Sequence, residues 1–372
     1  MFAAGGSGGH LFPAIAVAEA IRAARPDASL TLVSSMKSID TTIATHAGAD
    51  WETLAIPARS PAELRTAPWR TLRDNWRAWR EAARLLDVKR PDVVVGCGGF
   101  ASFPTLVAAR RRRTPILLLE QNVIPGRVTR WCARWAASIC CAFPHSLAHL
   151  RSGRPVATGN PVRQTIQFLR DSAAVPDAAI PTLLVLGGSQ GAHGINAGVA
   201  ELVRSRPQLF AGWRVVHQTG ERDRELLDEA YRAQGIQAEV VAFTSELPRH
   251  YSEASLVLSR AGATTLAELA CARLPSILVP YPQAADDHQR ANANVFAEAG
   301  ASLVVEQTSP DFPRRLAEAL QPLLTDSAAR RKLSDAAGTL GRPEAARTVA
   351  EQVLRLAAGS GETGFPQAPS AR

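Results

Sequence analysis

Residues 182–192 read TLLVLGGSQGA, in which an apolar run of five residues passes directly into a glycine-rich turn. Residues 1–10 read MFAAGGSGGH and repeat this arrangement at the start of the sequence. A buried strand, a glycine-rich turn and a helix form the opening unit of a doubly wound parallel sheet. Because the unit occurs twice, about one domain length apart, the sequence predicts two similar domains in tandem.

Strand-length apolar runs and helical segments alternate through the rest of the chain. The other predicted strands are Leu30–Ser34, Asp92–Val95, Pro115–Leu119, Arg214–Gln218, Glu239–Phe243, Ser255–Ser259 and Pro275–Val279. Predicted helices include Pro13–Ala24, Pro104–Arg112, Arg224–Gln234 and Thr265–Ala272. This alternation is typical of α/β proteins in which helices cover both faces of parallel sheets.

The length of 372 residues also favours two domains. We place the first at residues 1–160 and the second at 161–342, with ligand between them at the carboxyl ends of the strands. A helix over 343–357 is expected to pack back on the first domain, and residues 358–372 are expected to form a disordered tail. The first strand, Met1–Ala4, is shorter than the usual ~5–6 residues, so we expect either a clipped strand or an upstream start.

Composition excludes several classes of protein. The chain is 46% hydrophobic and 20% charged, which is typical of a globular protein. No apolar run approaches the ~18–20 residues of a spanning helix, and residues 1–10 do not resemble a secretory signal. The five cysteines are odd in number and lack metal-ligand spacing, which favours a reducing compartment without a structural metal.

Basic charge and tryptophan gather in the first half of the sequence. Residues 1–157 hold 21 Lys/Arg against 11 Asp/Glu, whereas the remainder holds 21 against 23, so the halves carry +10 and −2. A predicted helix from Pro68 to about Val88 carries two stripes at helical spacing: apolar Trp69, Leu72, Trp76 and Trp79, and basic Arg73, Arg77 and Arg80. Such a helix either docks on an anionic membrane surface or turns its tryptophans toward the core, and the number of tryptophans and the basic charge of this half favour docking.

The two glycine-rich turns indicate phosphate binding, because they present backbone N–H groups and a helix N-terminus to an anion. Neither turn contains the lysine of an ATP-binding P-loop. The strand Leu30–Ser34 does not end in the acidic residue that a dinucleotide fold uses to bind ribose. The turns therefore favour a phosphate-bearing ligand other than ATP or NAD.

Seven motifs in order make the sequence resemble the bacterial peptidoglycan glycosyltransferases that convert lipid I into lipid II. They are GGSGGHLFPAIAVA, GCGGFASFP, EQN, GNPVR, GGSQGA, SRAGATTLAE and DDHQRANA, and the resemblance spans roughly residues 1–357. It implies the GT-B fold, in which two Rossmann-like domains enclose a cleft. It also implies an inverting, metal-independent transfer of N-acetylglucosamine from UDP-N-acetylglucosamine (UDP-GlcNAc) to undecaprenyl-pyrophosphoryl-N-acetylmuramyl-pentapeptide (lipid I), with no cofactor.

The resemblance also implies site residues by position in these motifs. For UDP-GlcNAc it implies Ser7, Gly8, Gly9, Asn122, Arg163, Ser189, Thr244, Ala263, Thr264, Thr265, Leu266, Ala267, Glu268, His288 and Gln289. The implied acceptor side is Gly98, Gly99 and Ser102. The implied location is the cytoplasmic face of the inner membrane, as a peripheral protein, with other wall-synthesis proteins as further partners.

Three residues carry competing interpretations. His10 is a candidate general base for the acceptor hydroxyl, or it only hydrogen-bonds a loop carbonyl or the acceptor pyrophosphate. Glu120 is a weaker candidate base, or it orients the adjacent loop. Glu268 either binds ribose or closes a capping box with Thr265.

Three other functions remain open from the sequence. A UDP-GlcNAc 2-epimerase of the same fold would leave the Trp/Arg helix unexplained. A non-catalytic nucleotide-sugar-binding scaffold would not need both GGSGGH and GCGGFAS. A nucleic-acid binder is suggested only by the basic charge, and the sequence contains no recognisable nucleic-acid-binding module, so we expect no nucleic-acid partner.

Overall fold

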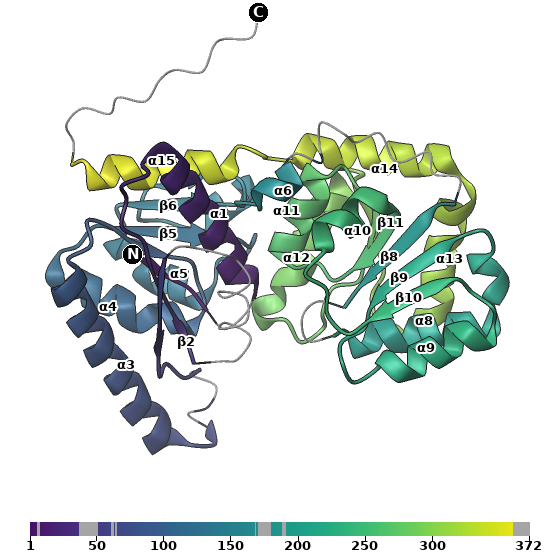
Figure 1. Ribbon diagram of the computed structural model, residues 1–372, viewed down its shortest axis with the longest axis horizontal. Coiled ribbons are helices and arrows are strands. Elements are labelled where there is room, and N and C mark those ends of the chain that lie inside the picture. Colours follow the sequence, from purple (N-terminus) through teal and green to yellow (C-terminus); the bar gives the residue numbers. More distant parts are fainter. Residues whose placement is uncertain are drawn as a thin grey trace, which may run out of the picture.

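The computed structural model describes residues 1–5, 8–36, 51–60, 63, 65–167, 169, 180–187 and 191–359. These residues build two β-sheets that lie side by side, each flanked by helices (Figure 1). Every strand pair in both sheets is parallel. The prediction of two doubly wound α/β units in tandem is therefore confirmed.

The first sheet has the strand order β3-β2-β1-β4-β5-β6-β7. Its strands are β1 (Phe2–Ala3), β2 (Thr31–Ser35), β3 (Glu52–Ile56), β4 (Val94–Gly96), β5 (Ile116–Glu120), β6 (Ser138–Cys141) and β7 (Pro155–Ala157). The short β1 pairs with β2 on one side and β4 on the other. The chain winds outward in both directions from this point, so the glycine-rich turn after β1 lies at the topological switch point.

The second sheet repeats this topology with the order β10-β9-β8-β11-β12-β13. Its strands are β8 (Thr182–Leu186), β9 (Arg214–Gln218), β10 (Ala238–Val241), β11 (Ala254–Ser259), β12 (Ser276–Leu278) and β13 (Ser302–Val304). All five residues of β8 are buried, as expected for a central parallel strand covered on both faces. The second glycine-rich turn follows β8 and also lies at a switch point.

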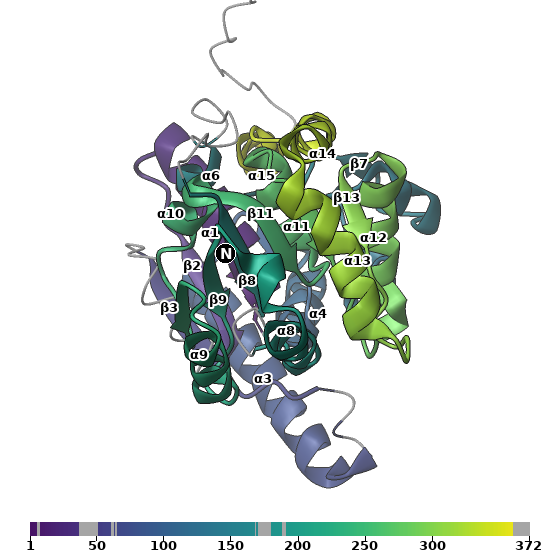
Figure 2. The same cartoon turned by 90° about the vertical axis from the view of Figure 1, so that its right-hand side faces the viewer.

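The helices connect successive strands and cover the sheets. They are α1 (Gly8–Ala24), α3 (Pro68–Lys89), α4 (Phe103–Arg112), α5 (Arg127–Cys132), α6 (Gln164–Gln167), α8 (His193–Ser205), α9 (Arg224–Ala233), α10 (Leu247–Glu253), α11 (Ala263–Cys271), α12 (His288–Glu298), α13 (Phe312–Thr325), α14 (Ser327–Leu340) and α15 (Ala345–Ala357). In both views α3 extends beyond the body of the first sheet (Figures 1 and 2).

The last two helices belong to different halves of the molecule. The α14 helix contacts α11 beside the second sheet, whereas α15 runs along α1 beside the first (Figure 1). Val349, Ala350 and Val353 of α15 are buried in the same apolar cluster as Phe2 and Leu11. The core around the first sheet therefore contains side chains from the end of the described chain.

Candidate active site

The first glycine-rich turn leads into α1, which begins at Gly8 and carries His10 in its first turn. The His10 ring lies against the loop after β4, because a Cβ on Gly98 would be 3.0 Å from His10 Cε1. Gly98 and Gly99 have φ angles of +89° and +73°, which side chains rarely adopt. Because Gly98 and Gly99 of GCGGFAS have no side chains, their backbone packs directly against the His10 ring. Ser7 and Ser189 lie outside the described residues.

Ser102 has a local role in the same loop. Its buried hydroxyl donates to the carbonyl of Gly99 at 2.8 Å, which closes the short turn before α4. Of the predicted acceptor-side residues, Gly98 and Gly99 therefore contact His10, whereas Ser102 stabilises their conformation.

Glu120 ends β5 and organises the loop that follows it. One carboxylate oxygen accepts from the backbone N–H of Asn122 at 3.0 Å, and the other accepts from the N–H of Gly126 at 2.9 Å. The side chain is buried, and this burial raises the pKa of Glu120 even though the hydrogen bonds oppose the shift. Because both oxygens are engaged, the geometry favours the loop-orienting interpretation over the catalytic one.

The half-buried Arg163 of GNPVR pairs with the buried Glu268 of α11. Arg163 Nη2 donates to Glu268 Oε1 at 2.9 Å, and the Tyr251 hydroxyl donates to Glu268 Oε2 at 3.0 Å. Burial raises the pKa of Glu268, while the Arg163 guanidinium opposes that change. The guanidinium also lies 4.7 Å from the centre of the Phe12 ring on α1. The pair therefore joins the second domain to the first.

The capping-box interpretation of Glu268 is wrong. Helix α11 begins at Ala263, with Gly262 as its N-cap, and no side chain caps it. Thr265 consequently lies inside the helix and cannot be its N-cap. Ribose binding by Glu268 stays a prediction.

The start of α11 touches the first glycine-rich turn. The Thr264 hydroxyl donates to the carbonyl of Gly9 at 2.9 Å, across the two domains. Ala263 and Leu266 are buried in the second domain, while Thr265 and Ala267 are half-buried. Leu266 packs in the apolar core, and its N–H donates to the carbonyl of Gly262 at 2.9 Å.

The other predicted donor residues are Thr244, in the loop before α10, and His288 and Gln289, at the start of α12. The Thr244 hydroxyl accepts from the N–H of Glu246 at 3.0 Å just before α10. Gln289 Oε1 accepts from the N–H of Tyr281 at 2.9 Å, and His288 Nδ1 lies 2.7 Å from the carbonyl of Ala285. Gln289 thereby ties the start of α12 to the loop after β12.

A buried polar network supports the second glycine-rich turn. Gly191 has φ +75°, and a Cβ on it would be 2.5 Å from the carbonyl oxygen of Thr219. Asn196 Nδ2 donates to that carbonyl at 2.8 Å, and Asn196 Oδ1 lies 3.1 Å from His217 Nε2. His217 is thus a neutral, buried support of the turn, because burial lowers its pKa to about 3.

Sequence reasoning missed two contacts that bridge the domains. Asp286 accepts from Arg130 Nη2 of α5 at 2.5 Å and lies 3.5 Å from Arg127 Nη2. Asn292 of α12 contacts the EQN loop of the first domain. Both residues belong to DDHQRANA, but only their pairing with distant segments identifies them, and sequence spacing does not encode that pairing.

The exposed face of α3 is the second functional candidate. Trp69, Leu72 and Trp76 are 83%, 55% and 54% exposed, whereas Trp79 is half-buried and stacks against Arg111. The interpretation in which the tryptophans face the core is therefore wrong for Trp69 and Trp76. Arg73, Arg77 and Arg80 are exposed beside them, and the Arg80 guanidinium lies 4.8 Å from the Trp76 ring centre.

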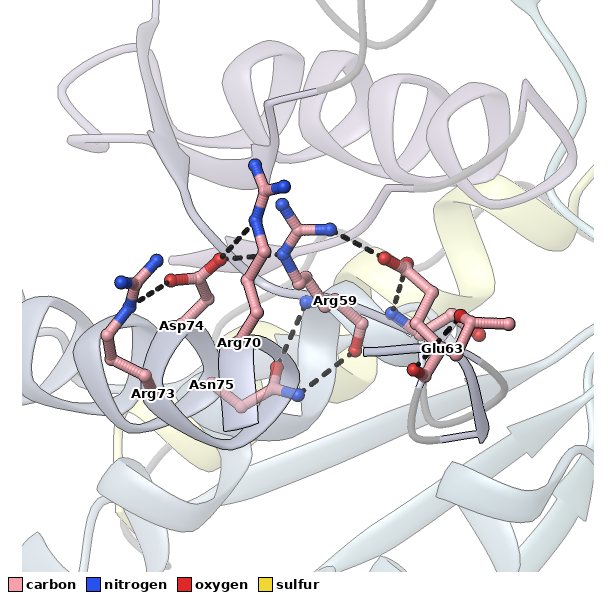
Figure 3. A network of polar contacts seen from close by, with 8 residues as sticks. Arg59, Glu63, Arg70, Arg73, Asp74 and Asn75 are labelled. Atoms are coloured by element: carbon pink, nitrogen blue, oxygen red, sulfur yellow. Dashed lines mark hydrogen bonds and ion pairs between the residues drawn. The ribbon is translucent and has the colours of Figure 1, made fainter. Parts of the chain in front are cut away.

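The opposite face of α3 is fixed to the first domain by a polar network (Figure 3). Arg59 Nε donates to Asp74 at 2.6 Å, and its Nη1 donates to Glu63 at 2.6 Å. Asn75 exchanges two hydrogen bonds with the backbone of Arg59. Arg70 and Arg73 of α3 itself also pair with Asp74, and the bonds from Arg59 hold this face of the helix against the first domain (Figure 3). Trp69 and Trp76 lie exposed elsewhere on the helix.

Metal and membrane-spanning sites are absent from the part of the chain that the structure describes. No three His, Cys, Asp or Glu side chains in it come together as a metal-binding group. Likewise, none of its helices combines the length and the apolar character needed to cross a membrane.

Two family models match the chain. The glycosyltransferase family 28 N-terminal domain matches residues 1–141, and the glycosyltransferase family 28 C-terminal domain matches residues 182–351. Both glycine-rich turns therefore lie in or at the edge of a matched region.

Curated relatives match along almost the whole chain. A UDP-N-acetylglucosamine–N-acetylmuramyl-(pentapeptide) pyrophosphoryl-undecaprenol N-acetylglucosamine transferase of Anaeromyxobacter sp. (strain K) is 36% identical, covering 96% of this chain and 92% of the relative. The protein of that name from Geobacter sulfurreducens is 37% identical, over 95% and 97%.

Solved structures agree in fold. MurG of Acinetobacter baumannii aligns with a TM-score of 0.74 and 27% identity over 95% of this chain and 98% of that one. A UDP-N-acetylglucosamine 2-epimerase aligns with a TM-score of 0.66 but 13% identity over 95% of each chain, which is a likeness of fold alone.

Proposed function

The chain belongs to glycosyltransferase family 28, and on that premise we propose that it transfers N-acetylglucosamine from UDP-GlcNAc to lipid I, yielding lipid II and UDP. Relatives that carry this activity in their names match the chain from end to end at 36–37% identity. It is thus a hexosyltransferase of peptidoglycan synthesis.

One observation carries the assignment of the site. Segments assigned to the donor come from both domains and are hydrogen-bonded to one another, as in the bond from Thr264 to the carbonyl of Gly9. The N-termini of α1 and α11 meet there, and helix N-termini favour anions. This supports placing the UDP-GlcNAc diphosphate near the start of these helices, beside Arg163.

His10 is the proposed base. The muramyl 4-hydroxyl attacks the anomeric carbon of N-acetylglucosamine, and the bond from that carbon to the UDP oxygen breaks. His10 accepts the hydroxyl proton, and UDP leaves with the bonding electron pair, so the anomeric configuration is inverted. Packing of the imidazole against Gly98 and Gly99 supports this role, because it fixes the ring beside the loop assigned to the acceptor.

Helix α3 is the proposed membrane contact. Lipid I is held in a bilayer by its undecaprenyl chain, so an enzyme that acts on it must approach the membrane surface. Exposed tryptophans take positions at the lipid headgroups, and each arginine near an anionic surface adds about 1 kcal/mol. We therefore place the protein peripherally at the cytoplasmic face of the membrane, where other wall-synthesis proteins are accessible as partners.

The test is a transfer assay with labelled UDP-GlcNAc, with and without a lipid I analogue. We expect UDP release and labelling of the lipid only when the acceptor is present. Conversion of UDP-GlcNAc into its C2 epimer without acceptor would indicate an epimerase, and donor binding without turnover would indicate a scaffold. If His10→Ala and His10→Gln both retain near-normal turnover, the base assignment fails while the transfer activity stands.

A further inference from the structure

Asn292 lies where the loop after β5, the loop after β11 and helix α12 meet. Its side chain projects from α12 and is 0% exposed. Its Oδ1 accepts from the N–H of Val123 at 2.9 Å, and its Nδ2 donates to Asn122 Oδ1 at 3.0 Å and to the carbonyl of Ala261 at 3.3 Å. One amide thus joins the loop after β5, the loop after β11 and the start of α12.

The hydrogen bonds of the Asn122 side chain fix the orientation of its amide, that is, the positions of Oδ1 and Nδ2. Its Oδ1 faces the donor group of Asn292, and its Nδ2 donates to Glu120 Oε1 at 3.4 Å. A carboxylate oxygen only accepts, and the Nδ2 of Asn292 only donates, so a single orientation of Asn122 satisfies both. In that orientation Asn122 offers an N–H donor to a ligand.

We propose that Asn292 is a positioning residue for the transfer reaction, acting through Asn122. This inference rests on the proposed function. When the two domains adopt this arrangement, Asn292 fixes the Asn122 amide with its N–H toward an acceptor oxygen of the bound nucleotide sugar. The same α12 helix carries His288 and Gln289, so one element aligns donor residues of both domains.

A purely structural role would have a different signature. Loss of a buried amide lowers stability wherever the amide lies, because its former partners are left unsatisfied. Loss of the Asn292 amide lowers kcat/KM by way of Asn122 only if the orientation of the Asn122 side chain depends on Asn292. Kinetics of paired variants therefore separate the two roles.

The experiment compares Asn292→Ala, Asn122→Ala and the double variant, with lipid I analogue and UDP-GlcNAc as substrates. We expect Asn292→Ala to lower kcat/KM by on the order of 10–100-fold, as for a misplaced contact. We expect the double variant to lose no more than Asn122→Ala loses alone. Asn294→Ala, which is exposed on the same helix, is the matched control and stays within about twofold of wild type.

Asn292→Asp keeps the acceptor for Val123 and removes the donor to Asn122, so it tests the same point with little change in shape. Wild-type kinetics in both Asn292 variants, or losses that multiply in the double variant, would overturn this inference alone. A wild-type protein that transfers no label would overturn the proposed function and this inference with it.

Discussion

The loop after β4 can adopt its conformation beside His10 only because Gly99 has no side chain. Its φ is +73°, and a Cβ would lie 2.5 Å from the carbonyl oxygen of Gly5. We expect Gly99→Ala to lower the free energy of unfolding by about 1–3 kcal/mol from backbone strain, with a further loss from the clash. Transfer activity should fall as well, because the loop then moves relative to His10. Thermal unfolding and the transfer assay measure the two effects.

Gly235 provides the control for Gly99. It has φ +62°, but nothing lies within 4 Å of a Cβ there. Gly235→Ala therefore carries strain without a clash and should leave the transfer rate unchanged. Equal losses of activity in the two variants would contradict a specific role for the loop.

His217 gives a pH dependence with a defined sign. Burial lowers its pKa to about 3, whereas an unfolded imidazole titrates near ~6.5. Between these values the unfolded chain binds the extra proton, so the free energy of unfolding falls as the pH drops, by about 1.4 kcal/mol per pH unit. Above pH ~6.5 His217 is neutral in the folded and the unfolded chain, so its contribution to the free energy of unfolding is fully present.

Hydrogen exchange of the β9 amides in wild type and His217→Gln measures this effect. From pH 6.5 to pH 5 the wild type should lose about 2 kcal/mol relative to the variant, which lacks the titrating ring. Parallel pH profiles in the two proteins would contradict the assignment of a buried, neutral His217.

Most strands are predictable from the sequence, including β10 at the edge of the second sheet, whereas β3, β6, β7 and β13 are not. The run at β8 is apolar apart from Thr182, and β9 is predicted to the residue although Val215 and Val216 are its only apolar residues. The missed strands β3 and β7 lie at the edges of the first sheet, are largely exposed and carry no apolar pattern. The missed β6 and β13 are only four and three residues long. Only tertiary pairing defines these strands.

The exposed face of α3 supports a prediction about membrane binding. We expect Trp69→Glu/Trp76→Glu to abolish most binding to vesicles of either anionic or zwitterionic lipid, because the apolar contact is lost. Leu226→Glu on α9 changes an exposed apolar residue outside α3 and should not change vesicle binding. Vesicle co-sedimentation measures both, and equal effects would argue against a docking role for α3.

The arginines of α3 act through charge and should respond differently. Arg77→Ala/Arg80→Ala removes about 2 kcal/mol of attraction to an anionic surface, which is a loss of about 30-fold in affinity. The loss should disappear on zwitterionic vesicles and shrink at high salt. An equal loss on both lipid types would assign these arginines a structural role instead.

At the scale of the whole molecule, the first sheet depends on the last helix. Val349 of α15 is buried against the core that contains Phe2 and Leu11. We expect Val349→Ala to destabilise the first domain by about 2 kcal/mol. Hydrogen exchange should accelerate in β1, β2 and β4 and not in the second sheet.

Leu333 on the neighbouring α14 is the matched control, because it is buried in the core of the second sheet. Leu333→Ala should accelerate exchange in β8 and β9 instead. If both variants accelerated exchange in the same sheet, the assignment of α15 to the first sheet and α14 to the second would be wrong.

The passage of α14 into α15 has a consequence for dissecting the protein. The chain crosses from one sheet to the other near Gly159 and returns near Arg342, and a Cβ on Gly159 would lie 2.5 Å from the Cβ of Arg342. Two peptide links thus join the halves at one place, so cutting either link alone does not release one half from the other. An expressed fragment that stops at the first crossing would leave the apolar side of α1 bare. An autonomous first half therefore requires residue 160 to be linked directly to residue 343, so that α15 is kept while the second half is left out.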